Sequence, residues 1–136
     1  MKILVIDAQG GGIGKQLVSA IKENVSNAVV TAVGTNTAAT AAMLKAGADN
    51  AATGENAVVV NSRRADVIVG PIGIVIADAM LGEITCRMAN AVAQSDAKRI
   101  LIPINHCDNI VVGVEDLNIG KLIQAVINEL VQTAQK

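Results

Sequence analysis

Short aliphatic runs alternate along the chain with longer segments whose apolar positions recur at helical spacing. The runs carry few charges, which is typical of strands that are buried on both faces of a sheet. They predict strands at residues 2–6, 28–33, 66–69 and 99–104, and a short edge strand at residues 49–53. Pro103 lies within the last run and indicates an edge or the end of a strand, because proline cannot donate to a sheet.

The segments between these runs predict helices. We expect helices at residues 13–24, 37–46 and 72–94, the last broken near Gly82 with Thr85 as a second N-cap. Residues 55–64 indicate a short helix, although their apolar triplet at 58–60 fits a strand equally well. Residues 110–114 predict a short extended piece. Residues 119–134 have the clearest helical periodicity of the chain.

This alternation predicts a parallel sheet with helices on both faces. About five strand–helix units in 136 residues fit an α/β fold with three layers, doubly wound around a mostly parallel sheet of about five strands, Rossmann-like or flavodoxin-like. The strand orders 3-2-1-4-5 and 2-1-3-4-5 fit the pattern equally well. The length is typical of one domain, so we expect residues 1–136 to form a single Rossmann-like domain of the nucleotide-binding type.

The segment KILVIDAQGGGIGKQL carries the strongest local signal. In it a buried strand passes through glycines at positions 10, 11, 12 and 14 directly into a helix. Glycines let the backbone turn tightly and approach a ligand, and the free N–H groups at a helix N-terminus attract an anion. Lys15 adds a cation there. The segment favours a nucleotide- or dinucleotide-binding protein that holds phosphate on residues 10–15, with NAD(P) or another nucleotide as its cofactor; whether it catalyses a reaction stays open.

Two dinucleotide-binding patterns match this loop in part. Gly10 and Gly12 fit the fingerprint G-x-G-x-x-G, but its last glycine is replaced by lysine. The variant G-x-x-x-G-x-G fits at its two later glycines, with Ala8 in place of the first. Neither pattern finds the acid that binds a ribose, because the second strand ends in the polar sequence Gly34-Thr35-Asn36-Thr37.

Two other interpretations stay open. Residues 11–15 resemble the GGxGK core of the deviant Walker motif of iron-protein-like ATPases, although Gln16 replaces the magnesium-binding hydroxyl and Gln9 the first glycine. An apolar run that ends in an acid is also present at residues 74–78, but it lies in a predicted helix. In the other interpretation the glycines only close a tight turn, and the protein is a non-catalytic oligomeric or regulatory subunit.

Ligands of open parallel sheets bind at the carboxyl ends of the strands. The predicted cofactor-binding residues are accordingly Asp7, Gln9, Gly10, Gly11, Gly12, Ile13, Gly14, Lys15, Gly34, Thr35, Asn36, Gly70, Pro71, Ile72, Gly73 and Asn105. The position of Asp7 suits binding of ribose or magnesium, and it suits capping of the following turn equally well. His106 and Cys107 are the candidates for a catalytic role, without a partner that would orient them. We predict no metal site, and we expect Cys86 in the core.

Composition narrows the range of partners. The sequence is 51% hydrophobic with no aromatic residue, and its 11 basic and 12 acidic residues form no block of one sign. We therefore expect a small phosphorylated ligand as partner and no nucleic acid, whose bases usually stack on aromatic rings. The longest uncharged apolar run, residues 67–77, is far below the ~20 residues of a membrane span.

The remaining sequence features concern location and assembly. The N-terminus MKILVID lacks the pattern of a signal peptide, and two cysteines make no disulfide framework. We expect a cytoplasmic protein that does not contact a membrane. The wide apolar stripe at residues 119–134 leaves room for a homodimer or a larger homo-oligomer.

The whole chain resembles an uncharacterised family of short bacterial Rossmann-like proteins, defined as a domain of unknown function. The resemblance is carried by VIDAQGGGIGKQL, by GTN with the alanine-rich segment after it, by VGPIGIVIADAMLGEIT and by ILIPINHCDNIVVGVED. It implies a compact Rossmann-like domain and nothing about a substrate.

Overall fold

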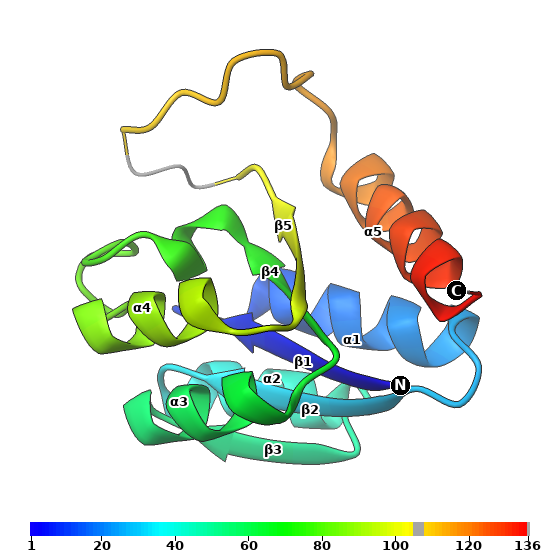
Figure 1. Ribbon diagram of the computed structural model, residues 1–136, viewed down its shortest axis with the longest axis horizontal. Coiled ribbons are helices and arrows are strands. Elements are labelled where there is room, and N and C mark those ends of the chain that lie inside the picture. Colours follow the sequence, from blue (N-terminus) through cyan, green and yellow to red (C-terminus); the bar gives the residue numbers. More distant parts are fainter. Residues whose placement is uncertain (105–107, 136) are drawn as a thin grey trace.

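The computed structural model describes residues 1–104 and 108–135 (Figure 1). Five parallel strands form one sheet in the order β3-β2-β1-β4-β5. The strands are β1 (Lys2–Asp7), β2 (Val29–Gly34), β3 (Asn50–Thr53), β4 (Val67–Pro71) and β5 (Lys98–Ile102). The predicted α/β class and parallel sheet are confirmed, and of the two predicted strand orders the chain adopts 3-2-1-4-5.

Helices cover both faces of this sheet. They are α1 (Gly12–Asn24), α2 (Thr37–Lys45), α3 (Glu55–Arg64), the 3₁₀ turn η1 (Ile72–Val75), α4 (Cys86–Gln94) and α5 (Ile119–Ala134). One apolar core packs α1, α2 and α5 on the sheet, and a second packs α3 and α4 on the opposite face. Successive residues of β1 alternate between them, since Ile3 lies in the first core and Leu4 in the second. The apolar runs are continuous for this reason.

The segment between β4 and α4 differs from the prediction of a mostly helical stretch over residues 72–94. Only one 3₁₀ turn follows β4, residues 76–84 form turns, and α4 begins at Cys86. Left-handed backbone explains the difference: φ is 67° at Asp78, 56° at Met80, 57° at Leu81 and 89° at Gly82. A right-handed helix cannot contain these residues. The predicted N-cap is confirmed, because the Thr85 side chain accepts a hydrogen bond from the Met88 N–H at 3.1 Å.

The structure also shows the environment of Cys86 and the conformation of residues 110–114 and 58–60. Cys86 is exposed at the start of α4 and does not lie in the core as predicted. Residues 110–114 were expected to be extended, but they include a turn at Gly113, whose φ is 85°. The triplet 58–60 is helical and belongs to α3.

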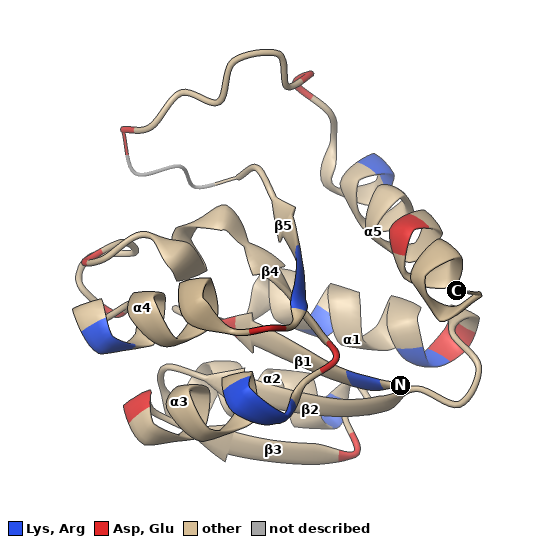
Figure 2. Ribbon diagram, viewed as in Figure 1, with Lys and Arg blue, Asp and Glu red and all other residues tan. Residues whose placement is uncertain are grey.

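The remaining features concern the segment before α5 and the surface of the protein. Residues 108–118, which precede α5, run outside the helical layers (Figure 1). Acidic and basic residues are spread over the helices and loops (Figure 2). Within residues 1–104 and 108–135, no helix has the length and apolar character needed to cross a membrane.

Candidate functional site

The carboxyl ends of β1, β2 and β4 meet at one edge of the sheet. β1 lies between the other two, with Asp7 opposite Gly34 of β2 and Val5 opposite Val69 of β4. The chain leaves β1 toward β2 and returns by α3 to β4 on the other side, so this edge is the topological switch point of the sheet.

Most of the predicted site residues are gathered at this edge. They come from the loop after β1, the end of β2, and the end of β4 with the turn after it. The ends of β1 and β4 approach each other closely, since a Cβ added to Gly70 would lie 2.5 Å from the Ile6 carbonyl oxygen. The candidates Asn105, His106 and Cys107 lie outside the described residues.

Asp7 holds the glycine-rich turn together. Its side chain is buried; Oδ1 accepts a hydrogen bond from the Ala8 N–H at 2.8 Å, and Oδ2 accepts one from the Gly14 N–H at 2.7 Å. Burial raises the pKa of Asp7, the hydrogen bonds from Gly14 and Ala8 act in the opposite direction, and the nearby charge of Glu83 raises the pKa further. The carboxylate therefore caps the turn, which is one of the roles that the sequence left open.

Two of the four loop glycines are required by packing. Gly11 has a φ of 71°, and a Cβ on it would lie 2.8 Å from the Ala39 Cα of α2. A Cβ on Gly14 would lie 2.6 Å from the Met43 Sδ and 2.8 Å from the Asp7 Cβ. These two glycines let α1 and the loop approach α2 and β1 closely.

The other two glycines, Gly10 and Gly12, have no such reason in the fold. A Cβ on either would meet no described atom within 4 Å, and neither residue has a positive φ. Their N–H groups donate no hydrogen bond to any described residue. Lys15 is exposed one turn further along α1. The outer surface of the loop thus combines open glycines, available N–H donors and a cation.

Glu83, from the turns before α4, joins this edge although it was not among the predicted site residues. Its Oε1 accepts hydrogen bonds from the Gln9 N–H at 2.9 Å, the Thr35 hydroxyl at 2.7 Å and the Asn36 Nδ2 at 2.7 Å. The hydrogen bond from Thr35 is the main cause that lowers the pKa of Glu83. An acid therefore lies at the end of β2, where the local sequence has none.

Asn36 connects Glu83 to the backbone of two elements. Its Nδ2 also donates to the Gln9 carbonyl oxygen at 2.9 Å, and its Oδ1 accepts from the Ala39 N–H at 2.9 Å as the N-cap of α2. The only signal for Glu83 in the sequence is its position after Gly82, where the predicted helix breaks. Across the described part of the chain, no group of three or more His, Cys, Asp and Glu side chains could hold a metal ion.

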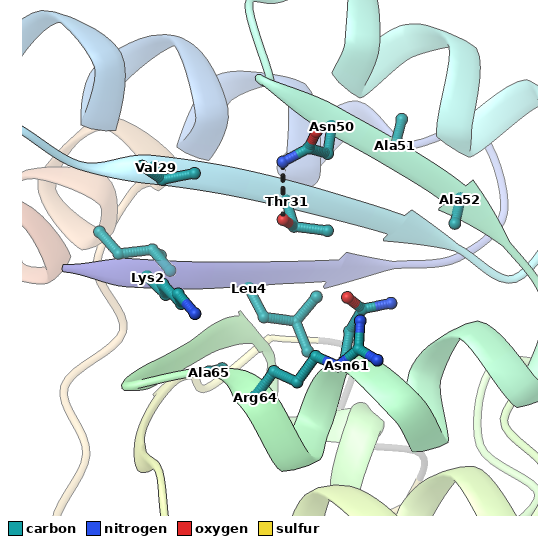
Figure 3. Close-up of a pocket in the computed structure, with 11 residues that line it drawn as sticks. Lys2, Leu4, Val29, Thr31, Asn50, Ala51, Ala52, Asn61, Arg64 and Ala65 are labelled. Atoms are coloured by element: carbon teal, nitrogen blue, oxygen red, sulfur yellow. Dashed lines mark hydrogen bonds between the residues drawn. The ribbon is translucent and has the colours of Figure 1, made fainter.

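A cavity of about 400 Å³ lies away from the glycine loop (Figure 3). It opens between the strands β1, β2 and β3 and the C-terminal end of α3, and none of the predicted site residues lines it. Lys2, Asn61 and Arg64 surround a floor that includes Leu4 and Ala52 (Figure 3). Its part of β1, residues 2–4, is at the amino end of that strand, so the cavity is separate from the switch point.

The strand order and the glycine turn at its switch point define a Rossmann-like α/β protein. The family model for DUF3842, a domain of unknown function, matches residues 2–135, and the chain belongs to this family. The family resemblance in the sequence is thereby confirmed.

The fold is also found in a protein of solved structure. No functionally curated protein matches the sequence significantly. A similar solved structure is that of a dodecameric FMN-dependent UbiX-like decarboxylase from Escherichia coli O157:H7. The TM-score is 0.50 at 18% sequence identity, and the match covers 96% of this chain and 76% of the other. At this identity the similarity shows the fold alone.

Proposed function

We propose that the protein binds a nucleotide or dinucleotide and holds its phosphate on the outer surface of residues 10–15. The observation that carries the proposal is the pair of open glycines, Gly10 and Gly12, at the switch point. Glycine costs conformational entropy on folding, and packing does not require it at these positions. A ligand that approaches the backbone closely would explain why glycine occupies these two positions.

The donors at the loop determine where the phosphate would bind. Asp7 already accepts the Gly14 N–H, so a phosphate would use the N–H groups of Gly10 and Gly12 together with the Lys15 ammonium. The positive end of the α1 dipole adds to their attraction for an anion. The ligand therefore lies over the beginning of the loop, toward Gln9 and the end of β2.

Calorimetric titration with NAD, NADP, FMN, ATP and a sugar phosphate tests the proposal. FMN is included because the similar structure is described as FMN-dependent. The chain has no Trp, Tyr or Phe, so intrinsic fluorescence cannot report binding. We expect at least one nucleotide to bind, Gly12→Leu to abolish that binding, and circular dichroism of the variant to remain that of the wild type.

A second pair of variants tests the cation. Lys15 and Lys121 are both exposed in the first turn of a helix, α1 and α5 respectively. Lys15→Ala should weaken binding about tenfold, as expected for a charge-assisted contact, and Lys121→Ala should leave it unchanged. Failure of every nucleotide to bind, or equal binding by wild type and Gly12→Leu, would refute the proposal.

A magnesium-dependent ATPase has less support from the geometry. Gln16 stands where the magnesium-binding hydroxyl is expected. Asp78, the acid at the end of the apolar run, follows η1 in a left-handed turn and does not end a strand.

Self-association is a second candidate function, compatible with ligand binding. Ile110 and Val112 are two residues apart and 90% and 92% exposed, and neighbouring apolar side chains exposed in this way are typical of an interaction surface. We propose that a second copy of the chain covers the Ile110–Val112 side chains. Light scattering should then give a mass above that of the monomer, and Ile110→Ser with Val112→Ser should reduce it; a monomeric wild type would contradict this.

A further inference from the structure

We infer that the Glu83 carboxylate accepts a hydrogen bond from the ribose of the ligand and thereby selects a ribose with a free 2′-hydroxyl. This inference rests on the proposed function and names the part of the ligand that its site distinguishes. Ribose recognition in a fold of this kind uses an acid close to the end of β2. Here β2 ends in Gly34-Thr35-Asn36, and the acid arrives from a segment far along the chain.

Glu83 is fixed in place by one of its two carboxylate oxygens. Oε1 accepts hydrogen bonds from Gln9, Thr35 and Asn36, which belong to the loop after β1 and the segment after β2. Oε2 has no hydrogen bond to any residue in the described part of the chain, and the side chain is only half-buried. One oxygen thus positions the carboxylate and leaves the other as an acceptor for a hydroxyl group.

The position of Glu83 relative to the open glycines supports this role. Gln9, whose N–H donates to Glu83, directly precedes Gly10 in the loop on which the phosphate is proposed to lie. A ribose that follows the phosphate toward β2 would therefore approach Glu83. Thr35 and Asn36 use their donor atoms on Glu83, so they orient the acid for the ribose.

The segment that carries Glu83 has an unfavourable backbone. Asp78, Met80 and Leu81 are left-handed although none of them is glycine. Ala79 and Met80 are nevertheless buried in the second core, which holds the segment against the sheet edge. Residues with such backbone cluster at active sites and ligand-binding sites.

The chemistry of a carboxylate predicts the ligand preference. A 2′-hydroxyl donates a hydrogen bond to it, a 2′-deoxyribose cannot, and a 2′-phosphate is repelled by its charge. We therefore expect adenosine 5′-monophosphate (AMP) to bind the wild type about tenfold more tightly than either 2′-deoxy-AMP or adenosine 2′,5′-bisphosphate.

Calorimetry with these three probes on the wild type and on Glu83→Gln tests the inference. The glutamine side-chain oxygen keeps an acceptor for Gln9, Thr35 and Asn36, so the variant removes the charge and preserves the shape. We expect the ratio of AMP to bisphosphate affinity to fall about tenfold in Glu83→Gln. The control Glu115→Gln removes an exposed acid outside this network and should leave the ratio unchanged.

The outcomes separate this inference from the proposed function. If AMP binds and Gly12→Leu abolishes its binding, but Glu83→Gln leaves the ratio unchanged, the ribose assignment is wrong and the phosphate site stands. Equal tightening of all three probes in Glu83→Gln would show general repulsion of anions and also overturn the assignment. Equal wild-type binding of AMP and 2′-deoxy-AMP overturns it without any variant. If no nucleotide binds the wild type, both proposals fail.

Discussion

Alanine at position 12 and alanine at position 14 should change the stability of the protein in opposite directions. Both glycines lie in the first turn of α1, two residues apart, so the two substitutions add the same methyl group to the same helix. At Gly12 that methyl group would meet no described atom within 4 Å. At Gly14 it would lie 2.8 Å from the Asp7 Cβ and 2.6 Å from the Met43 Sδ.

The size of each effect follows from these contacts. Gly→Ala at a position that tolerates alanine stabilises by about 0.4–1 kcal/mol, chiefly because the unfolded chain loses freedom. The Gly14 contacts cost about 1–3 kcal/mol, as extra atoms do in a filled core. The Met43 side chain can rotate away, but Asp7 cannot retreat, because β1 lies between two strands and the Asp7 carboxylate accepts two backbone hydrogen bonds. We therefore expect Gly14→Ala to lose about 1–2 kcal/mol.

Urea and thermal unfolding followed by far-ultraviolet circular dichroism measure both variants. A change of 1 kcal/mol shifts the Tm by about 3–5 °C at this chain length. We expect Gly12→Ala to unfold at or above the wild-type temperature and Gly14→Ala several degrees below it. A Gly12→Ala variant that loses more than about 1 kcal/mol would show that the fold itself requires this glycine. It would remove the main support for a ligand site on the loop.

Two further predictions concern the segment that carries Glu83. Leu81→Asn should raise the free energy of unfolding by about 0.5–1 kcal/mol, because Leu81 is left-handed and 97% exposed, and asparagine adopts this backbone more readily; a lower urea midpoint would contradict it. Because the pKa of Glu83 is lowered from 4.5, its contribution to stability is complete above that pH and is lost as the pH falls through its folded-state pKa. The stability difference between wild type and Glu83→Gln should therefore shrink in acid; a difference that grows would refute the assigned direction. The raised pKa of Asp7 has the opposite sign, so its contribution to stability is lost as the pH rises.

The elements that the sequence predicts well are those with local causes. The buried run of β1, the glycines after it and the apolar spacing of α5 each depend on neighbours a few residues away. The strand order has no local cause: after β3 the chain crosses to the far side of β1, and α3 packs on the face opposite to α1 and α2. The same strands and helices in the other order would show the same pattern.

The segment before α4 shows how a local pattern can mislead. Its apolar residues suit a helix, and only Gly82 indicates the left-handed turns that Asp78, Met80 and Leu81 also adopt. Because the segment was predicted to be helical, the position of Glu83 could not be foreseen. The hydrogen bonds that Thr35 and Asn36 donate to Glu83 span 48 and 47 residues, so no local pattern indicates them.

The division of donors at the loop bears on how tightly a nucleotide can bind. In a helix N-terminus without an internal acid, all the free N–H groups are available to a phosphate. Here Asp7 accepts the Gly14 N–H and Glu83 accepts the Gln9 N–H, so the proposed phosphate would have the N–H groups of Gly10 and Gly12 and the Lys15 ammonium. The base gains no ring stacking either, a contribution of about 1–3 kcal/mol where aromatic residues are present, because the chain has none. If a nucleotide binds as proposed, its phosphate and base are both held by few contacts, and the ribose then contributes a larger share of the affinity. Substitution of Glu83 should therefore affect binding as strongly as substitution of Lys15.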